Sequence, residues 1–235
     1  MTFKGWQKTS LIDYPDKISS VLFCGGCNLR CPFCYNRDLV LYPGKLDDLP
    51  GETVLEYLLE NRALYQAVCV TGGEPTLYDE LPAFLAQVKE LGLLVGLETN
   101  GTRRAMLEEL IAACLVDFIA MDLKAPLVFE KYRQASGNGD EKIFRAVMQS
   151  VELITASEIA YEFRFTVVPE IHRSEDVLEL GSQIKGARRL VLQQFSPEQT
   201  LDRALQNCVP YPEEQFLEWQ EKLKPLVGDC ALRNL

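Results

Sequence analysis

Runs of apolar and β-branched residues alternate along this chain with stretches of helical period, and this alternation limits the folds open to it. The predicted strands are Ile18–Phe23, Ala67–Thr71, Leu93–Thr99, Asp117–Asp122, Tyr161–Pro169 and Arg189–Phe195. The predicted helices lie near Glu52–Arg62, Asp79–Leu91, Arg103–Cys114, Glu141–Ala156, Ser174–Lys185 and Pro212–Leu226. Strand and helix alternate six times, which predicts a parallel sheet with right-handed crossovers.

Six such units are too few for a closed eight-stranded barrel but suit an open one. The predicted fold is therefore α/β, a partial (β/α)6 TIM-like barrel built on a parallel sheet. The 235 residues contain no Pro/Gly/Ser linker and no repeat, so we expect one domain over residues 1–235. The connection Ala125–Asp140 is long for this fold, and long connections are often functional or mobile.

The bulk composition argues against several classes of function. The formal net charge is −10, and no Lys/Arg-rich run is present, which argues against a general nucleic-acid or anionic-membrane surface. Only one histidine, His172, is present, which largely rules out a histidine base or a multi-histidine metal site. No run is apolar enough to span a bilayer and the N-terminus does not resemble a signal peptide, so we expect a cytoplasmic protein.

Four cysteines fall within eleven residues: Cys24, Cys27, Cys31 and Cys34. Because disulfides are rare in the cytosol, a metal centre or redox chemistry explains such a cluster better. The other four cysteines are scattered, and we expect them to be buried thiols that pack as small apolar groups: Cys69, Cys114, Cys208 and Cys230.

Unusual polar or glycine-rich segments end the first four predicted strands. The cysteine cluster follows the first strand, and the next three strands end in Thr71-Gly-Gly-Glu-Pro75, Glu98-Thr-Asn-Gly101 and Met121-Asp-Leu-Lys124. Each segment alone could be only a turn. Together they predict one site, because the carboxyl ends of parallel strands meet at a single rim where such folds bind ligands.

The fifth predicted strand carries an arginine toward the same interior. Every second residue of this strand is apolar and should pack under helices: Tyr161, Phe163, Phe165 and Val167. The residues between them, Glu162, Arg164 and Thr166, should therefore face inward. A buried arginine needs an anionic partner. That partner is either a structural carboxylate, from Glu162 or Asp122, or the carboxylate of a ligand. Gln193 has the corresponding inward position on the sixth strand.

The spacing Cys27-x-x-x-Cys31-x-x-Cys34, with Phe33 before the last cysteine and Gly72-Gly-Glu-Pro75 one strand later, resembles the radical S-adenosylmethionine superfamily. The resemblance implies a [4Fe-4S] cluster held by Cys27, Cys31 and Cys34, with S-adenosylmethionine chelating the fourth iron. It places Gly72, Gly73 and Glu74 at the methionyl ammonium, Phe33 near the adenine and Arg164 on the carboxylate or ribose side. The expected cofactor site is completed by Thr99, Asn100, Asp122, Lys124 and Gln193.

A closer resemblance covers most of the chain. Ser10-Leu-Ile-Asp-Tyr-Pro15, Glu98-Thr-Asn-Gly101 and Ala120-Met-Asp-Leu-Lys-Ala-Pro126 look like segments of the proteins that activate anaerobic ribonucleoside-triphosphate reductase. These belong to the wider group of glycyl-radical-enzyme activating enzymes. The resemblance implies that S-adenosylmethionine is cleaved reductively and that a glycine of the partner enzyme becomes a radical. It also implies an electron donor of the flavodoxin or ferredoxin type.

Two details of that resemblance concern individual residues. Related activating enzymes hold a monovalent cation at positions matched here by Glu98, Thr99 and Asp122. This chain departs from their pattern in two ways: Glu98 replaces the more usual aspartate, and Ala120 stands where a carbonyl ligand is needed. Asp13 is a candidate for contacting the substrate backbone or, equally, a simple turn residue before Pro15.

Cys24 leaves other functions open. The four cysteines could form a closed tetrathiolate zinc site or a four-cysteine electron-transfer cluster, either of which would make the chain a non-catalytic protein. Within the superfamily, a small-molecule enzyme similar to carboxy-deazaguanine synthase is the alternative to an activating enzyme. We expect Cys24 to stand outside the ligand set.

Overall fold

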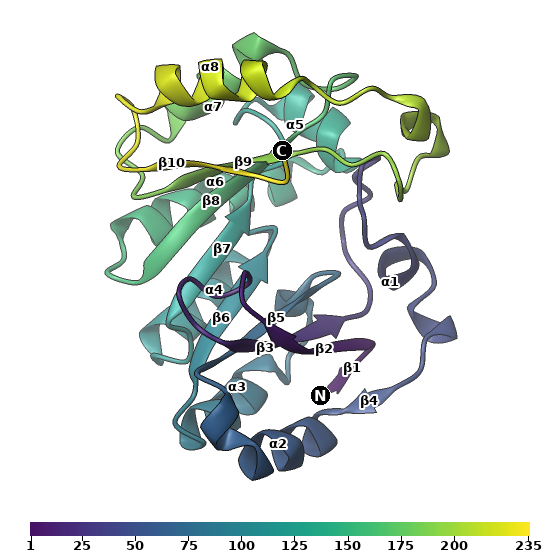
Figure 1. Cartoon of the computed structure of the whole chain (residues 1–235), viewed down its shortest axis with the longest axis vertical. Helices are drawn as coiled ribbons and strands as arrows, with labels where there is room; N and C mark the ends of the chain where they lie inside the picture. The colour runs from purple at the N-terminus through teal and green to yellow at the C-terminus, as the bar shows by residue number, and fades with distance from the viewer.

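One curved sheet of eight strands organises the chain, which the computed structural model describes over residues 1–235 (Figure 1). The strands lie in the order β10-β9-β8-β7-β6-β5-β3-β2, and all neighbours are parallel except β2 and β3. Their bounds are β2 Gly5–Ser10, β3 Ser19–Cys24, β5 Ala67–Gly72, β6 Leu94–Thr99, β7 Phe118–Asp122, β8 Ala160–Val167, β9 Leu190–Gln194 and β10 Cys230–Arg233. A two-stranded sheet pairs β1 (Thr2–Phe3) with β4 (Leu49–Pro50).

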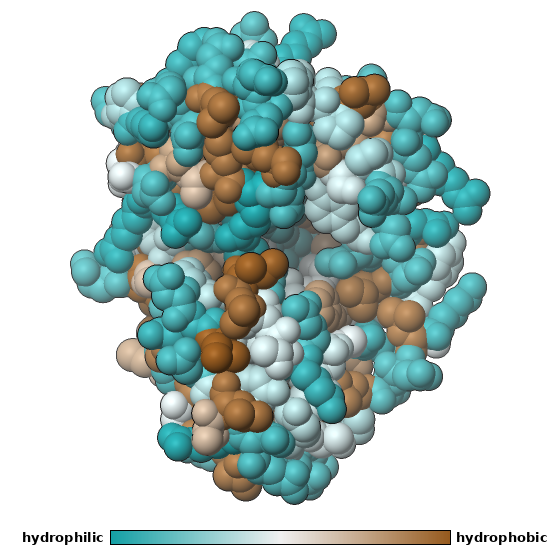
Figure 2. All heavy atoms as spheres, in the orientation of Figure 1, coloured by the Kyte–Doolittle hydropathy of each residue, from teal (hydrophilic) through white to brown (hydrophobic).

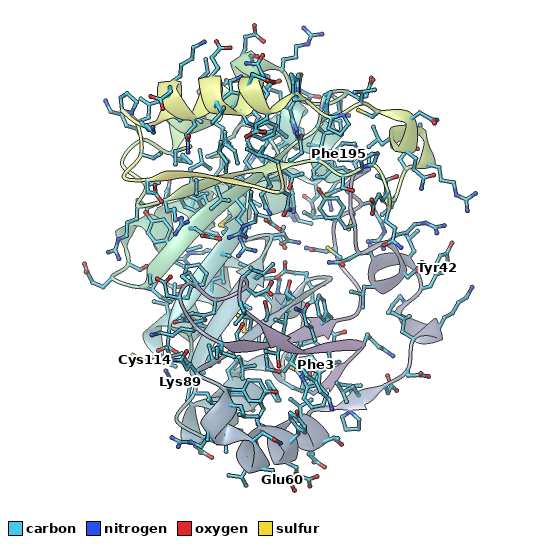
Figure 3. The ribbon with its side chains drawn as sticks, in the orientation of Figure 1. Phe3, Tyr42, Glu60, Lys89, Cys114 and Phe195 are labelled. Carbon is cyan, nitrogen blue, oxygen red and sulfur yellow. The ribbon has the colours of Figure 1, made fainter.

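Helices cover the outer, convex side of this sheet (Figure 1). They are α2 Gly51–Glu60, α3 Leu81–Glu90, α4 Arg104–Ala112, α5 Phe129–Ser136, α6 Glu141–Ala156, α7 Ser174–Gln183 and α8 Glu213–Leu223. A short further helix, α1 (Arg37–Leu41), follows the cysteine loop and lies apart from this layer (Figure 1). Side chains fill the space between these helices and the strands, from Phe3 at one end to Phe195 at the other (Figure 3). None of the helices is long and apolar enough to cross a membrane.

The two faces of the sheet have separate apolar cores because side chains alternate along each strand. In β3, Leu22 and Cys24 join the large core under the helices. Val21 belongs to a second, six-residue core on the inner face, against which Phe23 packs. Tyr14, from the loop between β2 and β3, completes this inner core and lies tilted against Phe118 with ring centroids 5.5 Å apart. The β2–β3 loop thus covers the barrel interior at the amino-terminal ends of the strands.

The six predicted strands and their parallel pairing are confirmed, and the structure adds elements that the pattern did not reveal. The sheet is extended at its two edges by β2 and β10. The connection predicted at 125–140 contains helix α5. Cys69, Cys208 and Cys230 are buried as predicted, but the prediction for Cys114 is wrong: it is exposed, at a left-handed turn (φ 52°) just after α4.

Candidate functional site

A cavity of about 200 Å³ opens at the carboxyl ends of the strands, more than ten times the space that one water molecule needs. We call it the reaction cavity. Every residue that the sequence assigned to the cluster or the cofactor lines it: Cys27, Cys31, Phe33, Cys34, Gly72, Gly73, Glu74, Thr99, Asn100, Asp122, Lys124, Arg164 and Gln193. Sequence reasoning missed Tyr35 and Asn36 in this lining, although both directly follow Cys34 in the chain.

Three of the four clustered cysteines face this cavity, and the fourth does not. Cys27, Cys31 and Cys34 line it as free thiols, whereas Cys24 is fully buried under the helices. The alternation along β3 explains the difference, since Cys24 shares the outward parity of Leu22. No three His, Cys, Asp or Glu side chains lie close enough together to hold a single metal ion.

Burial keeps the three cavity thiols protonated when nothing is bound. Desolvation raises the pKa of Cys27 to about 11 and that of Cys31 to about 12, and it also raises the pKa of Cys34. Lys124 opposes this rise at all three thiols. Metal binding must therefore release protons here, and the Lys124 ammonium is the cation placed to offset the thiolate charge.

The Gly-Gly-Glu-Pro loop lies directly against the cysteine loop. Gly73 N donates to Cys24 O at 2.8 Å, and Glu74 N donates to Gly26 O at 2.9 Å. A Cβ on Gly73 would stand 1.7 Å from Gly26 O, and Gly72 has φ +110° with its Cβ position 2.5 Å from Cys24 N. Both glycines are therefore required by close backbone approach rather than by flexibility.

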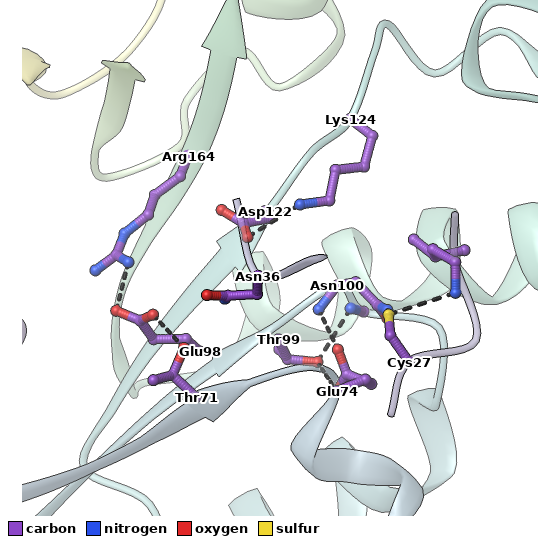
Figure 4. A network of polar contacts seen from close by, with 12 residues as sticks. Cys27, Asn36, Thr71, Glu74, Glu98, Thr99, Asn100, Asp122, Lys124 and Arg164 are labelled. Atoms are coloured by element: carbon purple, nitrogen blue, oxygen red, sulfur yellow. Dashed lines mark hydrogen bonds and ion pairs between the residues drawn. The ribbon is translucent and has the colours of Figure 1, made fainter. Parts of the chain in front are cut away.

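Glu74 ties the ends of two strands together. Its carboxylate is fully buried and accepts hydrogen bonds from Thr99 Oγ1 and Asn100 N, both at 2.7 Å, and from Thr76 N at 3.1 Å (Figure 4). Burial raises the pKa of Glu74, and these donors oppose the rise. Because the side chain is occupied by protein donors, the loop offers a ligand its backbone rather than this carboxylate.

Paired charges line the opposite wall of the cavity (Figure 4). Asp122 accepts a hydrogen bond from Lys124 Nζ at 3.0 Å. Arg164 donates to Glu162 at 2.6 Å and forms a second ion pair with Glu98. The structural pair of Arg164 with Glu162 is thus present, whereas the other partner considered, Asp122, binds Lys124 instead.

These pairs bear on the expected cation site. Glu98 accepts a hydrogen bond from Thr71 Oγ1 at 2.6 Å in addition to its ion pair with Arg164. Asp122 is neutralised by Lys124. A monovalent cation between Glu98 and Asp122 would have to compete with both cationic side chains.

His172 holds the backbone of Lys124 in place by a hydrogen bond. It is buried, its Nδ1 accepts a hydrogen bond from Val168 N at 3.1 Å, and its Nε2 therefore carries the proton and donates to Lys124 O at 2.8 Å. Burial lowers the pKa of His172 to about 4. The ring also contacts Phe33 edge-on, with centroids 6.0 Å apart. The one histidine is a neutral structural group, not a catalytic base.

The long connection at 125–140 supports the cysteine loop. Arg30 N donates to Ser136 O at 2.8 Å, and Asn138 Nδ2 donates to Asn28 O at 3.0 Å. Gly137 has φ +63°, and a Cβ there would meet Arg30 O at 2.3 Å. These contacts hold the loop that bears the cavity thiols in place.

Tyr35 links the cysteine loop to the far side of the sheet. Its hydroxyl donates to Gln194 O at 3.2 Å and accepts from Ser196 N at 3.2 Å. Nearby, Asp202 N donates to Pro32 O at 2.8 Å. The reaction cavity is therefore enclosed by the cysteine loop that follows β3 and, on the far side, by Gln193 of β9.

Comparison with known proteins agrees with this geometry. Residues 21–180, more than half of the chain, match the family described as the radical SAM superfamily. A Methanocaldococcus jannaschii protein provisionally named a glycyl-radical enzyme activating enzyme is 32% identical over 96% of this chain and 93% of its own. The pyruvate formate-lyase-activating enzyme of Clostridium pasteurianum is 28% identical over 83% of this chain and 81% of its own.

Two further similarities concern a short segment and the overall fold. The 7-carboxy-7-deazaguanine synthase of Hyperthermus butylicus is 44% identical over only 80 residues, 32% of each chain. A radical SAM methyltransferase structure from Sphaerobacter thermophilus superposes with a TM-score of 0.70 over 94% of this chain and 67% of that one, at 14% identity, which shows a shared fold. The chain is thus an enzyme of the radical SAM superfamily and a homologue of its glycyl-radical enzyme activating enzymes.

Proposed function

We propose that this enzyme generates a glycyl radical on a partner protein, and that the partner is an anaerobic ribonucleoside-triphosphate reductase. The observation that carries the proposal is that three thiols and the Gly-Gly-Glu-Pro loop line the same cavity, in a chain similar over its length to activating enzymes. The segments Asp13-Tyr-Pro15 and Asp122-Leu-Lys-Ala-Pro126 support the choice of reductase.

The residues present fit a [4Fe-4S] cluster and S-adenosylmethionine. Cys27, Cys31 and Cys34 would hold the cluster, since these are the free thiols that share the cavity. When bound, the two groups supply the reductive cleavage that yields a 5′-deoxyadenosyl radical. An electron donor of the flavodoxin or ferredoxin type would provide the electron.

The other cavity residues orient the cofactor. Gly72 and Gly73 line the cavity, where their backbone could meet the methionyl ammonium. Phe33, held edge-on by His172, offers an apolar surface to the adenine. Arg164 lies on the opposite wall, where its guanidinium can face a ligand carboxylate or ribose.

A second cavity favours a protein as substrate. It lies between the β2–β3 loop and the ends of the last strands, and it shares Arg164 with the reaction cavity; we call it the lateral mouth. Its rim includes Leu11 and Ile12, which are 71% and 72% exposed. Apolar side chains gather beside a recess on this face (Figure 2). An exposed aliphatic pair on the rim of a pocket that shares Arg164 with the reaction cavity suits a protein partner.

A small-molecule reaction like that of carboxy-deazaguanine synthase is the second candidate, favoured by the short segment of 44% identity. That segment covers 32% of the chain, whereas the similarity to the activating enzyme covers 96%. The shorter match supports a shared cofactor site more than a shared substrate.

The decisive experiment combines the reduced, cluster-loaded enzyme with S-adenosylmethionine and a candidate reductase under anaerobic conditions. We expect a doublet glycyl-radical signal in the electron paramagnetic resonance spectrum and one 5′-deoxyadenosine for each radical formed. A matched reaction uses the reductase with its radical-site glycine replaced by alanine, which should give no doublet. If 5′-deoxyadenosine forms only with a pterin-type small molecule, the second candidate replaces the first.

A further inference from the structure

The side chains of Asn28, Asn100 and Thr102 form a closed ring of hydrogen bonds beside the cavity thiols. Asn100 Nδ2 donates to Asn28 Oδ1 at 3.0 Å, Asn28 Nδ2 donates to Thr102 Oγ1 at 2.8 Å, and Thr102 Oγ1 donates to Asn100 Oδ1 at 2.6 Å. Thr102 N also donates to Asn100 Oδ1, at 3.0 Å. With both of its polar atoms bonded and only 5% of its surface exposed, Asn100 has a single orientation.

This orientation directs an amide N–H of Asn100 at one cavity thiol. Asn100 Nδ2 lies 3.6 Å from Cys27 Sγ, and Leu29 N donates to the same sulfur at 3.4 Å (Figure 4). Cys27 thus accepts one side-chain and one backbone hydrogen bond. The ring and this contact together occupy the polar atoms of the Asn100 side chain.

We propose that Asn100 is a positioning residue that raises the reduction potential of the cluster through its hydrogen bond to Cys27; this rests on the proposed function only in requiring a cluster on Cys27, Cys31 and Cys34. A ligand sulfur carries more negative charge when the cluster is reduced, so an N–H donor stabilises the reduced form more than the oxidised form. Asn100 thereby makes the cluster easier for its electron donor to reduce.

The test measures the midpoint potential of the reconstituted enzyme by a redox titration followed by electron paramagnetic resonance, without cofactor or partner. Asn100→Ala removes the amide donor and adds no charge. One net hydrogen bond corresponds to a shift of about fivefold to tenfold in the reduction equilibrium. We therefore expect the potential to fall, and a tenfold shift would be 59 mV for a one-electron couple.

Ser150→Ala is the matched control, because Ser150 Oγ donates to Gly101 O at 2.7 Å in the same turn but touches no thiol. We expect its potential to equal that of the wild type. Asn100→Ser, which also lacks the amide, provides a second variant whose iron content shows that the site is intact.

An unchanged potential in iron-replete Asn100→Ala or Asn100→Ser would overturn the inference. Loss of the cluster from both variants, with Ser150→Ala intact, would also overturn it in favour of a purely structural role. If the wild-type protein itself holds no cluster, the proposed function fails instead, so the two failures are distinguishable.

Discussion

The reaction cavity and the lateral mouth share Arg164, but they differ in how their polar groups are paired. In the reaction cavity, Glu74 and Glu98 accept hydrogen bonds of 2.6 to 2.7 Å from threonine hydroxyls. In the mouth, Arg164 pairs closely with Glu162 Oε1, but Arg233 and Arg189 lie 3.4 and 3.7 Å from Glu162, and the buried Glu162 Oε2 has no hydrogen-bond partner. The polar groups of the reaction cavity are therefore preorganised before anything binds, as a site for difficult chemistry must be, whereas those of the mouth are less completely paired.

The largest effect should come from removing a cavity thiol. We expect Cys27→Ser to lose the cluster and all cleavage of S-adenosylmethionine, because a ligand facing the cavity is gone. Cys24→Ser should keep about four irons per chain, since that thiol packs under the helices. Iron and sulfide analysis after reconstitution distinguishes them, and equal iron loss in both variants would refute the division of the four cysteines.

A second prediction concerns the contact between the cysteine loop and the Gly-Gly-Glu-Pro loop. Gly73→Ala places a methyl group on Gly26 O, so we expect the free energy of unfolding to fall by about 3 kcal/mol or more. Gly26→Ala is the control: it has φ +72° but open space around its Cβ position, and should cost only about 1 kcal/mol. Denaturant unfolding measures both, and equal losses would show that the cavity wall is not rigid.

The third prediction uses pH to test His172, which donates a hydrogen bond to the backbone of Lys124. The fold holds His172 neutral, with a pKa of about 4, while the unfolded chain binds a proton near the ordinary value of 6.5. Between these two pH values the unfolded state binds more protons than the folded state. The stability that neutral His172 contributes to the fold is therefore complete above pH 6.5 and is lost as the pH falls toward 4. Over this range the free energy of unfolding should fall by about 3 kcal/mol.

His172→Gln removes this titration and should flatten the stability profile over that range. Urea unfolding of the cluster-free protein at several pH values provides the comparison. Parallel profiles for the variant and the wild type would mean that another group controls acid stability.

The smallest effect is expected at the lateral mouth. Replacing Leu11 and Ile12 together with serine should lower kcat/KM for the protein partner about tenfold, while partner-independent cleavage of S-adenosylmethionine is unchanged. Val209→Ser serves as the control, because Val209 is also highly exposed but lines neither cavity. An unaltered KM in the double variant would remove this surface from the docking site.

Most of the parallel sheet and the lining of the reaction cavity could be predicted from sequence, because both follow from local pattern. Buried parallel strands read as apolar runs, and their carboxyl ends share one rim, so four motifs far apart in the chain could be assigned to one site. The inward parity of Arg164 and Gln193 followed in the same way, from alternation along a strand.

What escaped prediction depends on tertiary partners. The edge strand β2, Gly5–Ser10, is polar and largely exposed, and β10 has only four residues, so neither shows a strand pattern. Arg164 forms ion pairs with Glu98 and Glu162 rather than with Asp122, and side-chain geometry in the folded protein decides this. The ring that turns Asn100 toward Cys27 joins residues 72 and 74 positions apart, a relation that no local spacing records.

The bridge made by Tyr35 has a consequence for the order in which the molecule can be assembled. Each parallel strand lies next to its neighbour in sequence, so the sheet can grow from the N-terminus as the chain emerges from the ribosome. The cysteine loop, however, reaches its final wall only when Gln194 and Asp202 are in place. The thiols are therefore synthesised well before the residues that complete their enclosure, so the cysteine loop stays open until most of the sheet has been made.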